Sequence, residues 1–446
     1  MLIKEKIKFF MKNLKNKFIK LISSINFYAL FVFQTILILI SYLRIFEYES
    51  CTELNLRSLN LFSFSFDFLY PKMCDEEYYF HGFQWINHIY EGGYVYQDRP
   101  LYLALGFIFY RFFYLVHYFL DFYIDPVSLL LFSTLIFQIF ILNLICFLLI
   151  KIFNNKFEFT NFILFFLLII FSFEERYYLF LPSSSTAYFL IFLFSIYALK
   201  NKKLFGFIFG LLFTVSAYGI IGFTFNILIN FKNKYITFNQ IVKNVFYFII
   251  PTLFFETTRI FLGLYLGPQF GVRYIYNAER YQQFVWVLRS IFDLNFKPSN
   301  SCQTLNNFIN CYINETIDFL ILFRFYIFIS LVCLVLLFFI NKNFKHLFKE
   351  VIYFSIYSYL FILFQGIYSY RIIYYSLGFL VYFIFAYFIN EIQDKLTSLF
   401  LTTLLSVYTL QRTNFSQFTF DLNAIEFFLF ALFIYNFIKN KQKQIN

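Results

Sequence analysis

The sequence predicts an all-α, polytopic membrane protein with about twelve transmembrane helices. The chain of 446 residues is 61% hydrophobic, whereas soluble domains are closer to half apolar. Its apolar runs approach the length of about 20 residues that a membrane-spanning helix needs. Lysine falls in short segments between these runs, as the positive-inside rule expects. The formal charge of +11 is therefore assigned to cytoplasmic segments, and nucleic-acid binding is not expected.

The N-terminal residues 1–26 form a basic tail, in which seven lysines precede the first apolar run. Such a tail is also typical of a signal peptide, but no small-residue cleavage site follows the run. We therefore expect a cytoplasmic tail that leads into a retained first span, residues 27–43. Residues 45–120 then make a first external loop, which is rich in acids and poor in lysine.

The apolar segment 101–120 closes this external loop and carries Arg111 and His117. We expect it to lie in the outer interface as an amphipathic helix. If it crossed the bilayer, the later lysine clusters would face outside, against the positive-inside rule. With an interfacial helix, each later cluster falls on the cytoplasmic side.

The remaining chain predicts spans that alternate between the two faces and leave both termini cytoplasmic, within a single membrane domain of residues 1–446. Residues 204–231 lie between two basic segments on the same face, so two short helices that turn near residues 216–220 are expected there. Residues 263–318 make a second external loop. The other spans are predicted over residues 127–150, 159–173, 186–199, 245–262, 319–340, 351–364, 372–389, 396–410 and 425–438.

Four cysteines fall in the two external loops. Cys51 and Cys74 lie in the first loop, and Cys302 and Cys311 lie in the second. Local pairs on the oxidising side of a membrane are candidates for disulfides. Because sequence does not determine connectivity, two disulfides, Cys51–Cys74 and Cys302–Cys311, and four free thiols both remain open.

One polar stretch, residues 75–102, differs from the apolar chain around it. It reads DEEYYFHGFQWINHIYEGGYVYQDRPLY and follows a basic tail and one span. This order resembles the first external loop of the GT-C superfamily of integral-membrane glycosyltransferases. It is most similar to bacterial enzymes that use polyprenyl-phosphate sugars, such as the lipid A aminoarabinose transferase and protein O-mannosyltransferase-like enzymes. The resemblance implies that Asp75 is the catalytic acid, with Glu76 beside it, and that Tyr102 closes the Pro-Leu-Tyr element.

The resemblance continues along the chain. Residues 200–251 run from a basic segment through Gly-xxx-Gly and paired apolar runs to a second basic segment and a span, as in the family. Tyr370-Arg371 resembles the family's late external Arg-Tyr element, although the order here is Arg-Ile-Ile-Tyr. The implied activity is that of a hexosyl or pentosyl transferase. It would move a sugar from a polyprenyl-phosphate donor to a lipid-linked glycan, lipid A or a protein, outside the bacterial inner membrane.

The chemistry of such a transfer accounts for these residue types. The lipid phosphate leaves as an anion, so no nucleotide and no Gly-rich phosphate loop is needed. A carboxylate on the opposite face takes the proton of the acceptor hydroxyl, and Asp75 with Glu76 is expected to do so. Arginine suits the departing phosphate because it binds oxyanions through two donors. The predicted substrate-binding residues are Arg99, Tyr102, Glu175, Arg176, Tyr370 and Arg371.

Several of these residues have alternative interpretations. Asp67 is the second choice of base, because it also follows the first span and stands among apolar residues. Residues 174–176 could be a solvated loop pair, and Arg371 could extend to the interface without binding substrate. His81 and His88 share a helical face by spacing, but no metal-binding signature surrounds them. No metal or cofactor is therefore expected.

Two other functional classes remain open. A secondary transporter or flippase would carry ionisable groups at mid-span and show internal repeats, whereas most ionisable groups here fall at span ends or in loops. A polymerase or ligase of surface polysaccharide would share the membrane setting but use a pyrophosphate-linked oligosaccharide. The sequence does not determine the sugar, the acceptor, the lipid chain or the oligomeric state.

Overall fold

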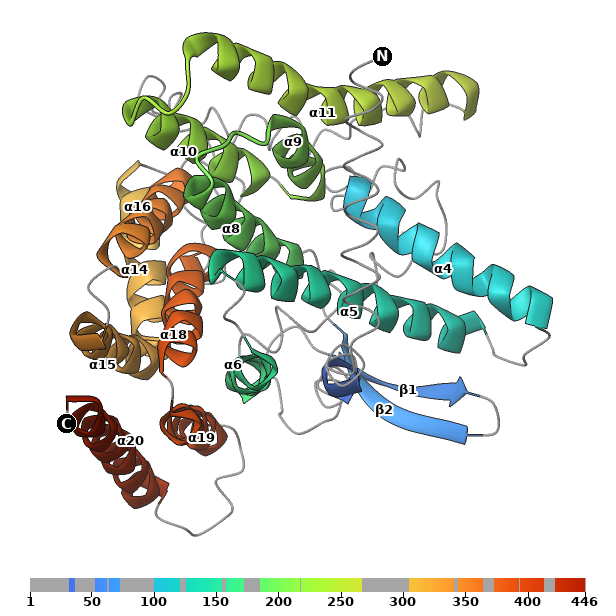
Figure 1. Cartoon of the computed structure of the whole chain (residues 1–446). Coiled ribbons are helices and arrows are strands. Elements are labelled where there is room, and N and C mark those ends of the chain that lie inside the picture. The colour runs from blue at the N-terminus through green and yellow to red at the C-terminus, as the bar shows by residue number, and fades with distance from the viewer. Residues whose placement is uncertain are drawn as a thin grey trace.

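A computed structural model of the chain describes most of its apolar segments. The described residues are 32–36, 53–61, 64–72, 100–120, 126–154, 158–171, 185–216, 218–266, 305–340, 344–363, 373–392, 394–412 and 422–445. Within them the fold is helical, with one two-stranded β-hairpin (Figure 1). The helical class that the sequence predicts is thus confirmed, with the hairpin as an addition.

Most helices cover the predicted apolar runs, although α11 and α16 begin seven residues earlier than predicted and most of α14 lies in the predicted loop 263–318. Helix α5, for example, covers the predicted run 127–150, and α8 covers the run 186–199. The helices are α4 (Pro100–Leu120), α5 (Pro126–Ile152), α6 (Phe159–Phe171), α8 (Ser185–Lys200), α9 (Gly206–Val215), α10 (Tyr218–Lys232), α11 (Phe238–Leu266), α14 (Leu305–Leu322), α15 (Arg324–Ile340), α16 (Phe344–Leu363), the π-helix η2 (Tyr374–Gly378), α18 (Phe379–Glu391), α19 (Lys395–Arg412) and α20 (Leu422–Ile445).

One β-hairpin adds to the predicted helical fold. Strands β1 (Glu53–Leu61) and β2 (Phe64–Lys72) pair antiparallel, with Ser58 opposite Asp67. They lie in the segment that the sequence analysis treats only as external loop. The sequence of β2 begins Phe-Ser-Phe-Asp-Phe, an apolar and polar alternation with the period of two that a strand requires.

Among the described residues, three helices are long and apolar enough to cross a membrane, and four if a bent pair counts as one span. Five shorter apolar helices have 10–17 residues, and at about 1.5 Å per residue they fall short of a hydrocarbon core of about 30 Å. The twelve-span arrangement therefore stays a prediction. The three long segments are Leu101–Phe119, Phe132–Ile152 and Phe238–Phe255.

The predicted span 319–340 coincides with a bent pair of helices that together are long and apolar enough for one span. Helices α14 and α15 meet at Phe323 with a bend of 71°. No Pro or Gly marks this position in the sequence. The Phe323 ring is buried and packs 4.6 Å from the ring of Phe319 and 5.5 Å from that of Tyr374, measured between centroids. The bend thus coincides with long-range packing, which the local sequence does not reveal.

The predicted pair of short helices within residues 204–231 is confirmed. Helices α9 and α10 have 10 and 15 residues, and Ser216 follows the end of α9. A Cβ atom added at Gly206 or Gly210 would overlap the backbone of Asn244 or Phe248 in α11. The Gly-xxx-Gly spacing therefore allows α9 to lie directly against the α11 backbone, as small residues do between membrane helices.

Helix α4 runs antiparallel to α5. Near the start of α4 the Tyr102 ring contacts Phe137, and farther along Phe113 contacts Phe132, so the two helices run in opposite directions (Figure 1). The length and composition of α4 also suffice for a span. Its predicted interfacial placement is not tested by these contacts and stays a prediction.

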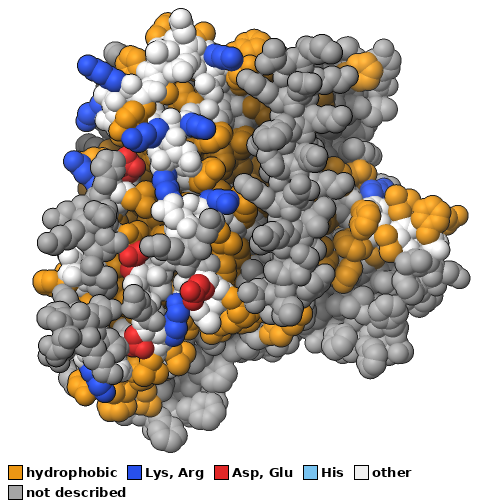
Figure 2. Space-filling model, in the orientation of Figure 1, with side chains coloured by type: hydrophobic (Ala, Val, Ile, Leu, Met, Phe, Trp, Pro, Cys, Tyr) orange, Lys and Arg blue, Asp and Glu red, His pale blue; other side chains and the backbone are white. Residues whose placement is uncertain are grey.

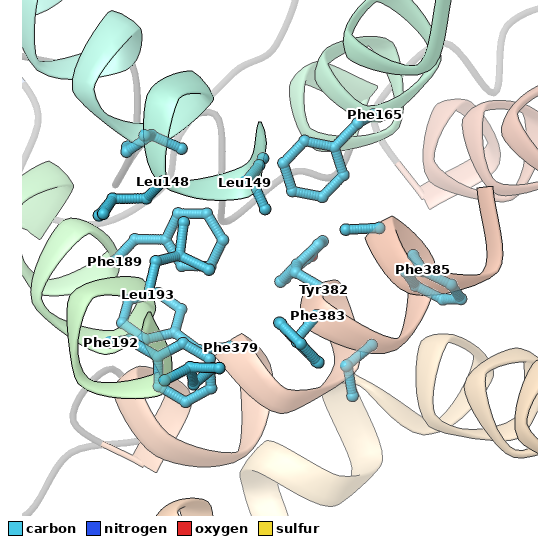
Figure 3. Close-up of a cluster of buried hydrophobic side chains, with 14 of the residues drawn as sticks. Leu148, Leu149, Phe165, Phe189, Phe192, Leu193, Phe379, Tyr382, Phe383 and Phe385 are labelled. Atoms are coloured by element: carbon cyan, nitrogen blue, oxygen red, sulfur yellow. The ribbon is translucent and has the colours of Figure 1, made fainter. Parts of the chain in front are cut away.

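The core is built from aromatic rings of three helices and leucine side chains of a fourth (Figure 3). Phe189 and Phe192 of α8 contact Phe379 of α18, with ring centroids 5.0 and 5.6 Å apart. Phe165 of α6 contacts Phe189, and Leu149 of α5 lies beside them. All five side chains are at most 1% exposed. Burial of this much apolar surface is the main term that stabilises the bundle.

The outer helices carry apolar side chains on both faces. On α15, Ile329, Cys333 and Leu337 are fully buried, whereas Leu331 and Val335 on the opposite face are each 54% exposed. Comparable exposed residues occur along α11 and α4. A soluble helix would present polar groups there, so these faces are those expected of helices surrounded by lipid.

Basic helix ends gather on one side of the molecule. The Lys200 ammonium at the end of α8 donates to the Lys151 carbonyl at the end of α5, at 3.0 Å. The Lys202 ammonium lies 4.2 Å from the Tyr235 ring centroid in the α10–α11 loop. Phe153 contacts Tyr387 near the end of α18. We call this side, which carries Lys151, Lys200 and Lys202, the lysine face. Figure 2 shows Lys and Arg side chains gathered toward α8 and α10.

Candidate functional site

Most of the predicted site residues cannot be placed. The Asp67 backbone lies in β2, and Tyr102 is the one predicted site residue whose side chain is described. The others, which lie outside the described residues, are Asp75, Glu76, Arg99, Glu175, Arg176, Tyr370 and Arg371. The structure describes the helices that adjoin these segments in the chain.

Tyr102 fixes the start of α4 against α5. Its side chain is only 1% exposed, and its ring centroid lies 5.2 Å from that of Phe137. The Gln138 side-chain amide donates a hydrogen bond of 3.1 Å to the Tyr102 hydroxyl. In this structure Tyr102 thus contributes packing and positioning, and its predicted role in substrate binding stays a prediction.

A second polar contact fixes the first predicted span to the same helix. Gln34 is buried, and the Asn143 amide donates to its side-chain oxygen at 3.0 Å. The Gln34 amide in turn donates to the Cys146 sulfur at 3.5 Å. Gln138 and Asn143 are five residues apart on α5, which corresponds to about 7.5 Å of rise. The first predicted span and the start of α4 are therefore both held on one stretch of α5.

Three tyrosines join α8, α10 and η2. The rings of Tyr188 and Tyr375 are stacked, with centroids 4.3 Å apart and planes at 10°. The Tyr218 hydroxyl donates to the Tyr375 carbonyl oxygen at 2.9 Å, and its ring lies 5.6 Å from Tyr188. We call Tyr188, Tyr218 and Tyr375 the tyrosine cluster. None of the three tyrosines is among the site residues predicted from the sequence.

The cluster includes a π-helix. Residues Tyr374–Gly378 form η2, a wide turn that occurs often at functional sites. A Cβ atom at Gly378 would overlap the Tyr374 ring, so the absence of a side chain permits the close approach. The Ser376 hydroxyl donates to the Ile373 carbonyl at 2.8 Å. Nothing in the local sequence distinguishes this wide turn from ordinary α-helix.

The tyrosine cluster lies away from the lysine face. Helix α8 begins at Ser185, close to Tyr188, and ends at Lys200 on the lysine face. Helix α18, which follows η2, also runs toward the lysine face, because Tyr387 near its end contacts Phe153. Two helices thus run from the cluster to the lysine face. If the lysine face is cytoplasmic, the cluster is on the outer side.

The cluster adjoins segments that carry predicted substrate-binding residues. Arg371 precedes Tyr375 by four residues, and Arg176 belongs to the segment that leads into α8. Helix α4, which follows Arg99, contacts α9, and the partner of α9 in the helix pair is α10, which carries Tyr218. Helices α4, α8 and η2, which follow the segments of Arg99, Arg176 and Arg371, are therefore joined through α9 and α10.

Amides and hydroxyls provide the polar groups of the described core. The fully buried polar side chains of the described ranges include no Asp, Glu, Lys, Arg or His. In the same ranges no group of three or more potential metal-ligating side chains is close enough to hold an ion. His81 and His88 lie outside these ranges, so the expectation that no metal binds is not tested there.

The apolar helices and their exposed apolar faces define the class as a helical protein with candidate membrane spans. Comparison of the chain with protein-family models, with curated proteins and with solved structures finds no match. The resemblance of the sequence motifs to the glycosyltransferase superfamily therefore stays a prediction.

Proposed function

We propose that the chain is a membrane glycosyltransferase of the GT-C type, with about twelve spans. It transfers a sugar from a polyprenyl-phosphate donor to a lipid-linked glycan, lipid A or a protein on the outer face of the bacterial inner membrane. The observation that carries the proposal is the motif order of residues 75–102, and the structural support for it is the tyrosine cluster. It joins the first turns of α8 and η2, and these are the helices that follow the segments of Arg176 and Arg371.

The reaction requires fixed cations next to the leaving phosphate. A guanidinium stabilises that charge only if its backbone is held in place before the reaction. The stacked rings of Tyr188 and Tyr375 and the hydrogen bond from Tyr218 provide such support for the helix that follows Arg371. We assign Arg371 as the main phosphate ligand, with Arg176 and Arg99 as further cations.

The sidedness of the cluster supports a site outside the cytoplasm. Polyprenyl-phosphate sugars of this class are used on the outer face, as the family resemblance implies. The cluster lies at the ends of α8 and η2 that are remote from Lys200 and Lys151, so an external position agrees with the positive-inside rule.

The composition of the described core favours an enzyme over an ion-coupled transporter. A transporter of that kind needs ionisable side chains inside its helices. The fully buried polar residues of the described helices are amides and hydroxyls.

The test uses a deletion strain and mass spectrometry of its glycolipids. The deletion should accumulate the polyprenyl-phosphate sugar and lose one glycosylated acceptor, and the wild-type gene should reverse both. Asp75→Asn should lower transfer about 100-fold or more, as expected for loss of a general base. Arg371→Gln should also impair transfer, and Arg371→Lys should impair it because a lysine cannot form the two-donor contact.

Asp67→Asn is the matched control, because Asp67 is an acid of the same loop and the second choice of base. It should leave transfer within about twofold of wild type if Asp75 supplies the base. Loss with Asp67→Asn alone would move the base to that residue. Unchanged glycolipids in the deletion strain would overturn the proposed function.

A further inference from the structure

The α8–α9 loop, the α10–α11 loop and the start of α11 carry lysines but no Asp or Glu. Between residues 200 and 255 the sequence contains six lysines and no Asp or Glu. Five of the six are exposed. Their charge therefore has no acidic partner within this stretch of the chain. These five are Lys202, Lys203, Lys232, Lys234 and Lys243.

The sixth lysine has a structural role. The Lys200 ammonium donates to the Lys151 and Ile152 carbonyls and to the Asn154 side chain. It thereby compensates the negative end of the α5 dipole. Partial burial lowers the pKa of Lys200. Lys200 is therefore not one of the exposed lysines that could bind a ligand.

The α8–α9 and α10–α11 loops form one surface. The Lys202 ammonium lies over the Tyr235 ring at 4.2 Å from its centroid, a distance typical of a cation–π contact. The Asn244 side chain accepts a hydrogen bond of 3.1 Å from the Gly206 backbone N–H. Lys202 and Lys234 both have left-handed backbones, with φ of 55° and 57°, which end α8 and α10 sharply.

The start of α11 adds the positive end of a helix to this surface. Thr237 and Gln240 form a reciprocal capping box, in which the Thr237 N–H donates to the Gln240 side-chain oxygen at 2.9 Å. The Gln240 N–H donates to the Thr237 hydroxyl at 3.4 Å. A helix N-terminus so defined favours an anion nearby, and Lys234 precedes it by three residues.

Exposed apolar side chains lie among these lysines. Phe231 is 52% exposed, Tyr235 is 44% exposed and Phe238 is 68% exposed. Lysines next to exposed aromatic and apolar side chains are the pattern of surfaces that lie in a membrane interface. Nucleic acid would not require the apolar part, so the combination favours a lipid partner.

We infer that this surface, which we call the paired-loop patch (Lys202, Lys203, Lys232, Lys234 and Tyr235), binds the headgroups of anionic phospholipids in the surrounding leaflet. The lysines contact the phosphates, while Phe231 and Phe238 extend into the acyl region. The cytoplasmic leaflet supplies anionic lipid, on the side where the lysine face is expected. The inference is independent of the proposed glycosyltransferase activity.

The experiment counts lipids retained by the purified full-length protein. The protein is exchanged into micelles with equimolar phosphatidylglycerol and phosphatidylcholine, and retained lipid is measured by native mass spectrometry. Wild type should retain phosphatidylglycerol in excess. Lys202→Gln with Lys234→Gln should lower that excess about tenfold or more, since each lysine near an anionic surface contributes about fivefold.

The matched control is Lys349→Gln with Lys439→Gln. Both of these lysines are exposed, and each lies over a tyrosine ring of its own helix, at 5.6 and 5.7 Å. The control should change the excess less than about twofold, because it leaves the paired-loop patch intact. Lys202→Arg with Lys234→Arg should retain the excess, which separates loss of charge from misfolding.

Three results would overturn the inference. An unchanged excess in the Gln variant would remove the patch as the site. An equal loss in the control variant would indicate diffuse attraction over the whole lysine face. Displacement of phosphatidylglycerol by an equal concentration of inorganic phosphate would identify a site for free anions, not for lipid.

Discussion

The Tyr218 hydroxyl donates a hydrogen bond of 2.9 Å to the Tyr375 carbonyl oxygen, across 157 residues of sequence. Tyr218 is 2% exposed, so water cannot replace this bond readily. It connects the α9–α10 pair to the first turn of the helix that follows Arg371.

The first prediction concerns this hydrogen bond. Tyr218→Phe should lower the free energy of unfolding by about 0.6 to 1 kcal/mol, the usual contribution of such a bond. Thermal unfolding in detergent measures the change. Tyr235→Phe is the control, because Tyr235 is 44% exposed, and it should leave the midpoint unchanged. Equal midpoints for Tyr218→Phe and wild type would contradict the structural role of the bond.

The second prediction concerns the close approach of α9 and α11. Gly206→Ala and Gly210→Ala should each destabilise the protein by about 1 to 3 kcal/mol, because the added methyl group meets backbone that cannot move aside. Phe207→Ala, on a residue that is 47% exposed, is the control on the same helix. Urea or thermal unfolding in detergent gives the values. A neutral Gly210→Ala would place α9 farther from α11 than described.

The third prediction concerns the attachment of α4 to α5. Tyr102→Phe and Gln138→Leu should each destabilise, and the double variant should lose less than the sum, with a coupling of about 0.5 to 1 kcal/mol. The pair is in direct hydrogen bond at 3.1 Å. Unfolding free energies of the four proteins complete the cycle. Strict additivity would mean that the two side chains do not interact in the membrane.

The fourth prediction concerns the sidedness of the lysine face. In a cysteine-free background, Lys203→Cys should resist a membrane-impermeant thiol reagent added outside intact cells, and should react after the cells are opened. Lys203 is exposed, so access to the reagent depends only on the side of the membrane. Labelling from outside would reverse the proposed orientation and would favour a crossing α4 over an interfacial one.

The positions of the helices could be predicted because apolar runs between lysines have clear limits. The run 186–199 and helix α8, which ends at Lys200, are one example. The α9–α10 pair could also be predicted, because two basic segments on one face exclude a single crossing. In both cases the signal is local, since it depends on composition over fewer than about 30 residues.

The bend at Phe323, the π-helix and the tyrosine cluster could not be predicted. Their causes are contacts between distant residues, such as Tyr188 with Tyr375. The chain contains 77 Phe and 38 Tyr, so the position of an aromatic residue in the sequence does not predict which other ring it contacts. The β-hairpin had a local signal in the alternation of β2, which the assignment of that segment to an external loop overlooked.

The two contacts on α5, through Gln34 and through Tyr102, have a further consequence for the chain between them. Its two ends are held at neighbouring points of one rigid helix, so the spacing of those ends does not depend on what connects them. Doubling the length of such a connection costs only about 0.6 kcal/mol in closure entropy. Insertions between the first predicted span and α4 should thus cost the folded helices little free energy, and a chimeric protein with a lengthened segment is a practical design.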